Sequence, residues 1–421
     1  MKKKVNPTFK ITPNMGIIWA MDEAIKLGFS NGNKEWSNLG QGQPEYGELK
    51  GAPARIKYIS IKISDYAYGP LNGMLELREA IARNYNILYR KNKESKYTSE
   101  NVSVAMGGRL VLTHICNMLG NIRLGYKIPE YPAYSDIINN HKGKIEAINI
   151  ETKQKNNFSI PGNDFSKTIK QNKLDAFLLS NPCNPTGEII RGDELKKYLE
   201  AINLNKCALI IDEMYSHYIF NDGKPGNKSV SIAKYITDVN KENVMIVDGL
   251  TKSFRCPGWR LAWTIGPKHL IENLNRVASA IDGGPSQPIQ RAALKILAPK
   301  TVDKETKALR KVFSRKRKLM VSLLRKSGIS CAGGIRGTFY VWGDISKLPF
   351  PLNNSTHFFN EALKLKVMTI PGNLFDIHPG IGKSKTLKFN NFIRFSFGPE
   401  ERNMLMGLAR LSNLIKNAKL T

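Results

Sequence analysis

The sequence of 421 residues contains no apolar run near the roughly 20 residues that are needed to cross a bilayer. Its five cysteines are widely spaced and form no Cys-x-x-Cys pair, which argues against both a disulfide framework and a zinc site. A short apolar stretch at 15–21 follows three lysines, but Asn14 and Asp22 bracket it and no small-x-small cleavage site follows. These absences predict a cytoplasmic protein without a bound metal.

Acidic residues are scarce: 35 Asp and Glu stand against 64 Lys and Arg, which gives a formal net charge of +29. Such a charge would suit a nucleic acid or an anionic membrane. The lysines are scattered, however, and basic residues cluster only in short runs such as 2–4 and 315–318. We therefore expect no specific nucleic-acid partner and no membrane partner.

Internal repeats and low-complexity linkers are also missing, and the length exceeds that of one usual core. Four apolar runs without alternation lie at 102–106, 174–179, 207–211 and 244–247. Strands of this kind are buried on both faces, so they predict an α/β fold with a mainly parallel sheet flanked by helices. Polar residues follow each run, at the sheet edge where ligands of such folds bind.

Lys252 follows shortly after the last of these runs, at 244–247. A lysine in a partly desolvated cleft can form a Schiff base with an aldehyde. Arg260 follows eight residues later, and Pro257-Gly258 forces a turn that can fold it back beside the amine. One amine and one guanidinium suit a cofactor that carries an aldehyde and a phosphate.

Three motifs carry a resemblance to a known family. They are Thr251-Lys252 followed by Pro-Gly-x-Arg, Asn-Pro-Thr-Gly at 184–187, and Asp-x-x-Tyr at 212–215. The chain resembles the class I/II aminotransferases, enzymes of fold type I that depend on pyridoxal 5'-phosphate (PLP). The resemblance extends from about residue 36 to residue 397, with the motifs in the family's order.

The resemblance implies a catalytic set of Lys252, Asp212 and Tyr215. Lys252 would hold PLP as a Schiff base and move the substrate α-proton, Asp212 would keep the ring nitrogen protonated, and Tyr215 and Asn184 would tune the phenolic oxygen. The residues implied at the cofactor are Gly107, Gly108, Arg109, Tyr131, Asn184, Asp212, Tyr215, Thr251, Lys252 and Arg260, with Tyr68 from the other subunit of a homodimer. Those implied at the substrate are Gly42, Asn184 and Arg394.

Several of these residues can also be interpreted without the family resemblance. Gly107-Gly108 lies between a strand and a helix start, an arrangement that aims backbone N–H groups at a phosphate. Gly42 is otherwise an ordinary loop residue, and Tyr68 a packing residue. Arg394 lies on an alternating strand at 392–397, on the face opposite Ile393 and Phe395, so we expect it to point away from the core.

From about residue 300 the chain changes character and begins a lysine-rich helix at 304–326. We predict a large PLP-binding domain at 56–300 and a smaller α+β domain formed by 1–55 plus 301–421.

Two positions depart from the family's pattern. Position 249 is glycine where many members have a serine that binds the phosphate, and position 109 is arginine where a small or polar residue is common. We hypothesise that Arg109 restores the lost contact; the alternative is a helix surface residue. No motif identifies the substrate side chain, although Tyr46, Tyr66 and 282–286 are candidates for its pocket.

The preferred function is transfer of an amino group between an L-amino acid and a 2-oxo acid. Elimination, replacement or cyclisation by a PLP enzyme on the same scaffold is the alternative, because the cofactor residues do not determine which bond of the substrate breaks. A non-catalytic regulator or a nucleic-acid module is a third reading, against which the presence of Lys252 argues.

Overall fold

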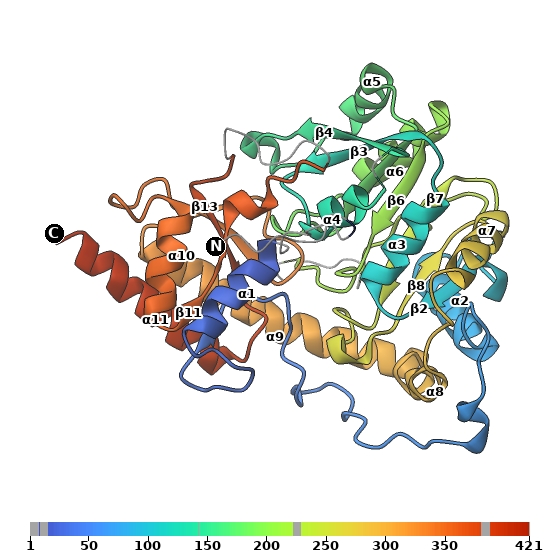
Figure 1. Ribbon diagram of the computed structural model, residues 1–421, viewed down its shortest axis with the longest axis horizontal. Coiled ribbons are helices and arrows are strands. Elements are labelled where there is room, and N and C mark those ends of the chain that lie inside the picture. Colours follow the sequence, from blue (N-terminus) through green and yellow to red (C-terminus); the bar gives the residue numbers. More distant parts are fainter. Residues whose placement is uncertain (1–7, 9–15, 142, 222–228, 380–387, 421) are drawn as a thin grey trace.

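Seven strands form the largest sheet of the protein, in the order β2-β8-β7-β6-β5-β3-β4 (Figure 1). The computed structural model describes Thr8 and residues 16–141, 143–221, 229–379 and 388–420. The strands of this sheet are β2 (Val102–Ala105), β3 (Ile122–Ile128), β4 (Ile145–Glu151), β5 (Ala176–Ser180), β6 (Ala208–Asp212), β7 (Val244–Gly249) and β8 (Ala262–Ile265). Every pair is parallel except those of β8, which runs antiparallel to β7 and β2. The prediction of a mainly parallel sheet is confirmed.

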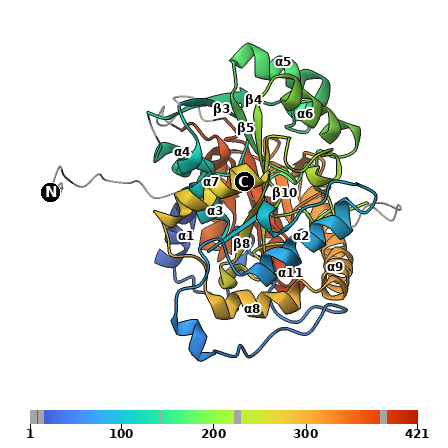
Figure 2. The same ribbon diagram turned by 90° about the vertical axis from the view of Figure 1, so that its right-hand side faces the viewer.

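Both faces of this sheet are buried, as the unbroken apolar runs predicted. Phe177 and Ile211 point to one face and pack in a core with α2, α5 and α6, while Leu178 and Ile210 point to the other and pack with α3 and α7. Figure 2 shows helices on either side of the sheet. The helices are α1 (Gly16–Lys26), α2 (Leu75–Tyr89), α3 (Gly108–Met118), α4 (Ala133–Asn139), α5 (Gly162–Asn172), α6 (Asp193–Leu204), α7 (Lys268–Ser279), α8 (Gln287–Ile296), α9 (Pro299–Lys326), α10 (Ser355–Lys364) and α11 (Glu401–Ala418).

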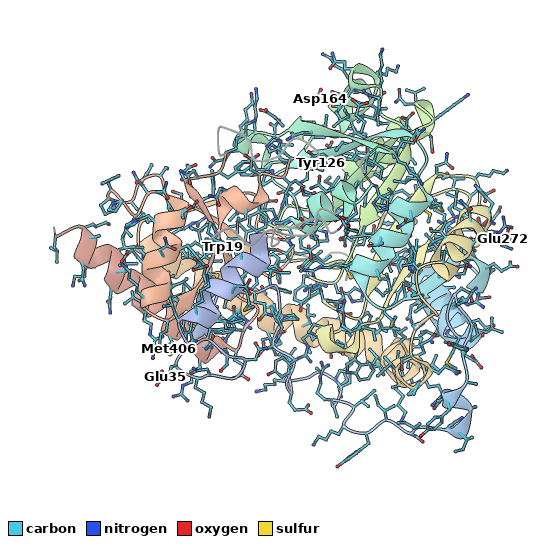
Figure 3. All side chains as sticks on the ribbon, viewed as in Figure 1. Trp19, Glu35, Tyr126, Asp164, Glu272 and Met406 are labelled. Carbon is cyan, nitrogen blue, oxygen red and sulfur yellow. The ribbon has the colours of Figure 1, made fainter. Side chains whose placement is uncertain are left out.

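The C-terminal third builds a second sheet of order β12-β13-β10-β9. Its strands are β9 (Ser330–Ala332), β10 (Tyr340–Asp344), β12 (Ile370–Pro371) and β13 (Phe392–Ser396). A two-stranded parallel pair joins β1 (Ser37–Asn38) to β11 (Val367–Met368), so the N-terminal segment is attached to the C-terminal part of the chain. Trp19 of α1, labelled in Figure 3, packs against Phe359 of α10 with ring centroids 5.3 Å apart.

The long helix α9 begins at Pro299, five residues before the predicted start. Proline is tolerated in the first helical turn because the N–H groups there have no helical partner. Helix α9 contacts α8 at one end and α11, β9 and β10 further along (Figure 1). Among the residues that the structure describes, no helix has the length and apolarity of a membrane span.

Candidate active site

A cavity of about 500 Å³ lies where the carboxyl ends of the large sheet meet β10, β13, the segment 41–43 and α1. Its walls include most of the residues predicted from the sequence: Gly42, Gly108, Arg109, Tyr131, Asn184, Asp212, Tyr215, Thr251, Lys252, Arg260 and Arg394. These residues come from segments more than 350 positions apart. Strand polarity brings them together, since β5, β6 and β7 all end at this edge.

Lys252 enters the cavity from the turn that follows β7. Its Nζ donates a hydrogen bond to the carbonyl oxygen of Gly42. Burial, together with the positive charges of Arg394 and Arg260, lowers the pKa of Lys252 to about 7. A large fraction of the amine is therefore unprotonated near neutral pH and able to attack an aldehyde.

Asp212 is the last residue of β6 and lies in the same cavity. Its Oδ1 accepts a hydrogen bond from the backbone N–H of Met214 over 3.1 Å, and its Oδ2 accepts one from the hydroxyl of Tyr134 over 3.0 Å. Burial raises the pKa of Asp212 to about 6. A cationic partner inside the cavity would stabilise the ionised form of this buried carboxylate. Tyr134 was not predicted as a site residue.

Tyr215 forms a hydrogen bond with a residue that the sequence analysis left without a role. The hydroxyl oxygens of Tyr215 and Tyr340 are 2.7 Å apart, and both rings are buried. Tyr340 is the first residue of β10, and the guanidinium of Arg394 lies 4.1 Å from its ring centroid. No motif in the sequence pointed to Tyr340.

Arg394 is buried in the cavity wall, with 1% of its surface exposed. Its Nη1 donates to Oδ1 of Asn184 over 2.8 Å and its Nη2 donates to the carbonyl oxygen of Gly40 over 2.5 Å. Its Nε has no hydrogen-bond partner within the described part of the chain. The expectation that Arg394 points away from the core needs correction, because both faces of β13 are buried and the side chain faces an internal cavity.

A concave corner forms at the N-terminus of α3. Gly107 has a φ of +95°, and a Cβ on it would lie 2.7 Å from Cζ of Arg260. A Cβ on Gly108 would lie 2.5 Å from Cε of Met214. The buried hydroxyl of Thr251 has no hydrogen-bond partner among the described residues. A helix N-terminus, a guanidinium and a free hydroxyl together fit a phosphate group.

The structure bears on both departures from the family pattern, Gly249 and Arg109. A Cβ at Gly249 would lie 2.8 Å from both Cα and Cβ of Ala262 on the adjacent strand β8, so packing excludes a serine there. Arg109 is exposed on the first turn of α3, and its Nε donates to the hydroxyl of Tyr131 over 3.4 Å. It lines the cavity, as the hypothesis of a phosphate contact requires.

Tyr68 lies apart from the other predicted residues. It is 96% exposed and is absent from the described lining of the cavity. Tyr46, Tyr66 and 282–286, the candidates for the substrate pocket, also lie outside that lining. Ile17, Ile18 and Met21 of α1 contribute apolar surface to the cavity instead. In the sequence this stretch was notable only as the short apolar run at 15–21, and no motif gave it a role at the site.

Comparisons with known proteins agree with this geometry. Residues 34–411 match the family model for aminotransferase class I and II. Aspartate aminotransferase of Pyrococcus abyssi is 26% identical over 93% of this chain and 94% of its own length. Aromatic-amino-acid aminotransferase 2 of Thermococcus litoralis is 24% identical over 91% and 92%.

The same relationship is visible in three dimensions. The structure of aspartate aminotransferase from Thermus thermophilus with maleate superposes with a TM-score of 0.77 at 20% sequence identity, over 96% of this chain and 97% of that one. The fold is thus shared over nearly the whole length of both chains. The family model covers the segments that build the cavity, except for α1. This chain belongs to the class I and II aminotransferases and is an enzyme that depends on PLP.

Proposed function

We propose that this chain transfers an amino group between an L-amino acid and a 2-oxo acid, with Lys252 as the residue that binds PLP and moves the proton. The observation that carries the proposal is that Lys252 and the buried carboxylate of Asp212 line the same cavity, where burial lowers the pKa of the amine to about 7. Bound PLP supplies an aldehyde for this amine and an electron-poor ring that stabilises negative charge on the substrate's α-carbon.

Each proposed role follows from the chemistry of the side chain. Nζ of Lys252, when free, accepts the proton from the α-carbon and later donates it. The carboxylate of Asp212 holds a proton on the ring nitrogen, which gives this buried acid its cationic partner. Arg394, which lines the cavity, would bind the substrate carboxylate through its guanidinium. Asn184 and Tyr215 would donate hydrogen bonds to the phenolic oxygen of PLP, and Tyr131 would hold the ring from one face.

The phosphate is proposed to bind in the corner at the start of α3. Arg260, Thr251 and the backbone of Gly107 and Gly108 supply its donors, and Arg109 adds a second guanidinium. The substrate carboxylate is proposed to receive a further hydrogen bond at Gly42. The close approach of Tyr340 to the backbone of Gly42, where a Cβ would overlap the Tyr340 hydroxyl, supports a glycine at this position.

We further propose that the enzyme is a homodimer in which Tyr68 reaches the phosphate of the neighbouring subunit. The segment 56–71 supports this proposal, because Tyr58, Ile61, Ile63 and Tyr68 are all more than 60% exposed in the single chain. Exposed apolar side chains in one segment are typical of an interaction surface. A cytoplasmic location is proposed from the five cysteines, all of them free.

A division into a large domain at 56–300 and a small domain of 1–55 plus 301–421 remains our proposal. The pairing of Ser37 with Val367 and of Asn38 with Met368 supports grouping the two ends of the chain. The cavity would then lie between the two domains, with Lys252 contributed by one and Arg394 by the other.

A half-reaction assay tests the function and separates it from the alternative. The PLP-loaded protein is mixed with single L-amino acids, and the 2-oxo acid and ammonia that form are both measured. Transamination yields one 2-oxo acid per amino group retained on the protein and no ammonia. Ammonia released in proportion to product would instead indicate elimination. Running the assay across acidic, aromatic and aliphatic amino acids also identifies the substrate class.

A further inference from the structure

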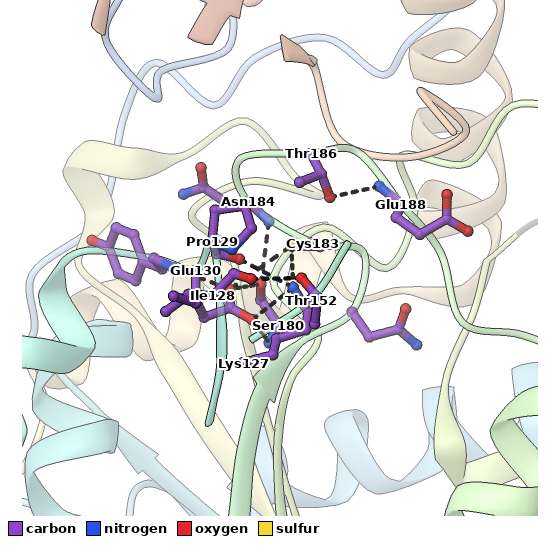
Figure 4. Close-up of polar contacts among 12 residues, drawn as sticks. Lys127, Ile128, Pro129, Glu130, Thr152, Ser180, Cys183, Asn184, Thr186 and Glu188 are labelled. Atoms are coloured by element: carbon purple, nitrogen blue, oxygen red, sulfur yellow. Dashed lines mark hydrogen bonds and ion pairs between the residues drawn. The ribbon is translucent and has the colours of Figure 1, made fainter. Parts of the chain in front are cut away.

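Behind the cavity wall, a buried carboxylate connects two segments that carry proposed site residues. Glu130 precedes Tyr131 and is 0% exposed. Its Oε1 accepts hydrogen bonds from the hydroxyl of Ser180 and, over 3.1 Å, from the backbone N–H of Tyr131. Its Oε2 accepts one from the backbone N–H of Ser180 over 3.3 Å. One carboxylate therefore joins the chain after β3 to the end of β5 (Figure 4).

Ser180 extends this connection to Asn184. The single hydroxyl hydrogen of Ser180 is directed at Glu130, so the oxygen is left to act as an acceptor. It accepts the backbone N–H of Asn184 over 3.2 Å. Oδ1 of Asn184 accepts from Nη1 of Arg394 over 2.8 Å. A path of hydrogen bonds, joined through the covalent frame of Asn184, thus leads from the buried carboxylate to the guanidinium in the cavity.

Lys127 balances the charge of Glu130. Its Nζ lies 3.4 Å from Oε2 of Glu130, 3.2 Å from the carbonyl oxygen of Pro129 and 2.9 Å from Sγ of Cys183. Burial alone would lower the pKa of Lys127, but Cys183 and Glu130 outweigh it and the pKa is raised. Buried ion pairs add little net stability compared with apolar residues of the same volume. The pair therefore calls for a reason other than stability.

We propose that Glu130 is a positioning residue for the substrate carboxylate: through Ser180 and Asn184 it holds the guanidinium of Arg394 in the orientation that receives that carboxylate. This inference rests on the proposed function, because it takes Arg394 as the residue that binds the substrate carboxylate. Glu130 itself does not reach the cavity, so it acts only through the path.

Two variants interrupt the path in different ways. Lys127→Met/Glu130→Met removes both charges while keeping the side-chain volumes similar, so no lone charge remains in the core. Ser180→Ala removes the relay hydroxyl and leaves the ion pair in place. Each is expected to raise KM for the amino acid about tenfold while kcat stays within about threefold of the wild type, because the binding lost is common to the ground state and the transition state.

Thr152→Val is the matched control. The Thr152 hydroxyl donates to the carbonyl oxygen of Ile128 over 2.5 Å, close to the ion pair but off the path. Its loss is expected to leave KM unchanged. Thermal unfolding of every variant is measured alongside, since a purely structural role would make KM follow the melting temperature.

Amide exchange gives a second readout that needs no substrate. In the segment 180–187, Pro182 and Pro185 have no N–H group, so the amide of Asn184 contributes strongly to the deuterium uptake of the peptide. Ser180→Ala and the double variant are expected to speed this uptake, with and without PLP, while Thr152→Val leaves it unchanged.

The outcomes separate the two proposals. Unchanged KM in Ser180→Ala, in the double variant or in both overturns the path from Glu130 to Arg394. Unchanged exchange at Asn184 in Ser180→Ala overturns it as well. A wild-type protein that transaminates no amino acid overturns the proposed function instead, and the exchange measurement still decides whether the path exists.

Discussion

The guanidinium of Arg260 lies directly against the backbone of Gly107, where an added Cβ would be 2.7 Å from Cζ. Gly107 also has a φ of +95°, which a residue with a side chain rarely adopts. Gly107→Ala is therefore expected to displace Arg260 and to weaken PLP binding about tenfold or more. Titration of PLP into the apoprotein measures the change in affinity.

Gly120→Ala is the control, because nothing lies within 4 Å of a Cβ at that position. Equal affinity for PLP in both variants would contradict the proposed phosphate corner.

Arg109 provides a test of the compensation proposed for Gly249. Arg109→Ala is expected to raise the dissociation constant for PLP about threefold to tenfold, because one charge-assisted contact to the phosphate is lost. Arg260→Ala should have a larger effect, since its guanidinium covers the glycine corner. Arg123→Ala, which breaks an exposed ion pair with Glu146, is the matched control. If Arg109→Ala binds PLP as the wild type does, Arg109 does not replace the missing serine.

Ionisation of Asp212 is expected to make the stability of the folded apoprotein depend on pH. Its folded-state pKa of about 6 exceeds the ordinary value of 3.8, because burial disfavours the charged form. The folded apoprotein thus binds the proton more tightly than the unfolded chain, and this group makes stability fall as pH rises from about 4 to about 6. Asp212→Asn removes the titration, so the variant apoprotein should be more stable than the wild type at pH 7.5, by up to about 3 kcal/mol.

Urea unfolding of both apoproteins at pH 4 and pH 7.5 measures this difference. The gain in stability is expected at the higher pH and not at the lower one, together with a large loss of transaminase activity. An equal response of the two proteins to pH would show that Asp212 ionises in the folded state as it does in water.

A subunit-mixing experiment tests the proposed role of Tyr68. Tyr68→Phe and Lys252→Ala subunits, each weakly active or inactive alone, are unfolded, mixed and refolded. If Tyr68 acts across the interface, a hybrid dimer contains one site with both native residues, and activity should recover to about a quarter of the wild type for random pairing. No recovery in a mixture shown by sedimentation to be dimeric would mean that Tyr68 does not act in the other subunit's site.

The strand that ends in Asp212 and the strand that precedes Lys252 could be predicted because β6 and β7 are apolar on both faces. Strand β3 could not, since Arg123, Gly125 and Lys127 interrupt its apolar residues. Lys127 is buried only because Glu130 and Cys183 meet it there, a tertiary contact that no local pattern reports.

Side-chain partners within the site were predictable only where a family motif named them. Tyr340 comes within 2.7 Å of Tyr215 because β10 and β13 pair with Tyr340 opposite Ser396, a register that the sequence does not reveal. Tyr134 reaches Asp212 because α4 lies beside the end of β6. The exclusion of serine at position 249 likewise depends on β8, a strand of four residues that the sequence analysis did not identify.

The proposed chemistry depends most directly on the amine at position 252. The PLP-loaded protein is reduced with borohydride, digested and mapped by mass spectrometry. We expect the phosphopyridoxyl group on the peptide that contains Lys252 and, in the Lys252→Ala variant, no labelled peptide. A label on another lysine of the wild type, or no label in a protein that has bound PLP, would contradict the proposed role of Lys252.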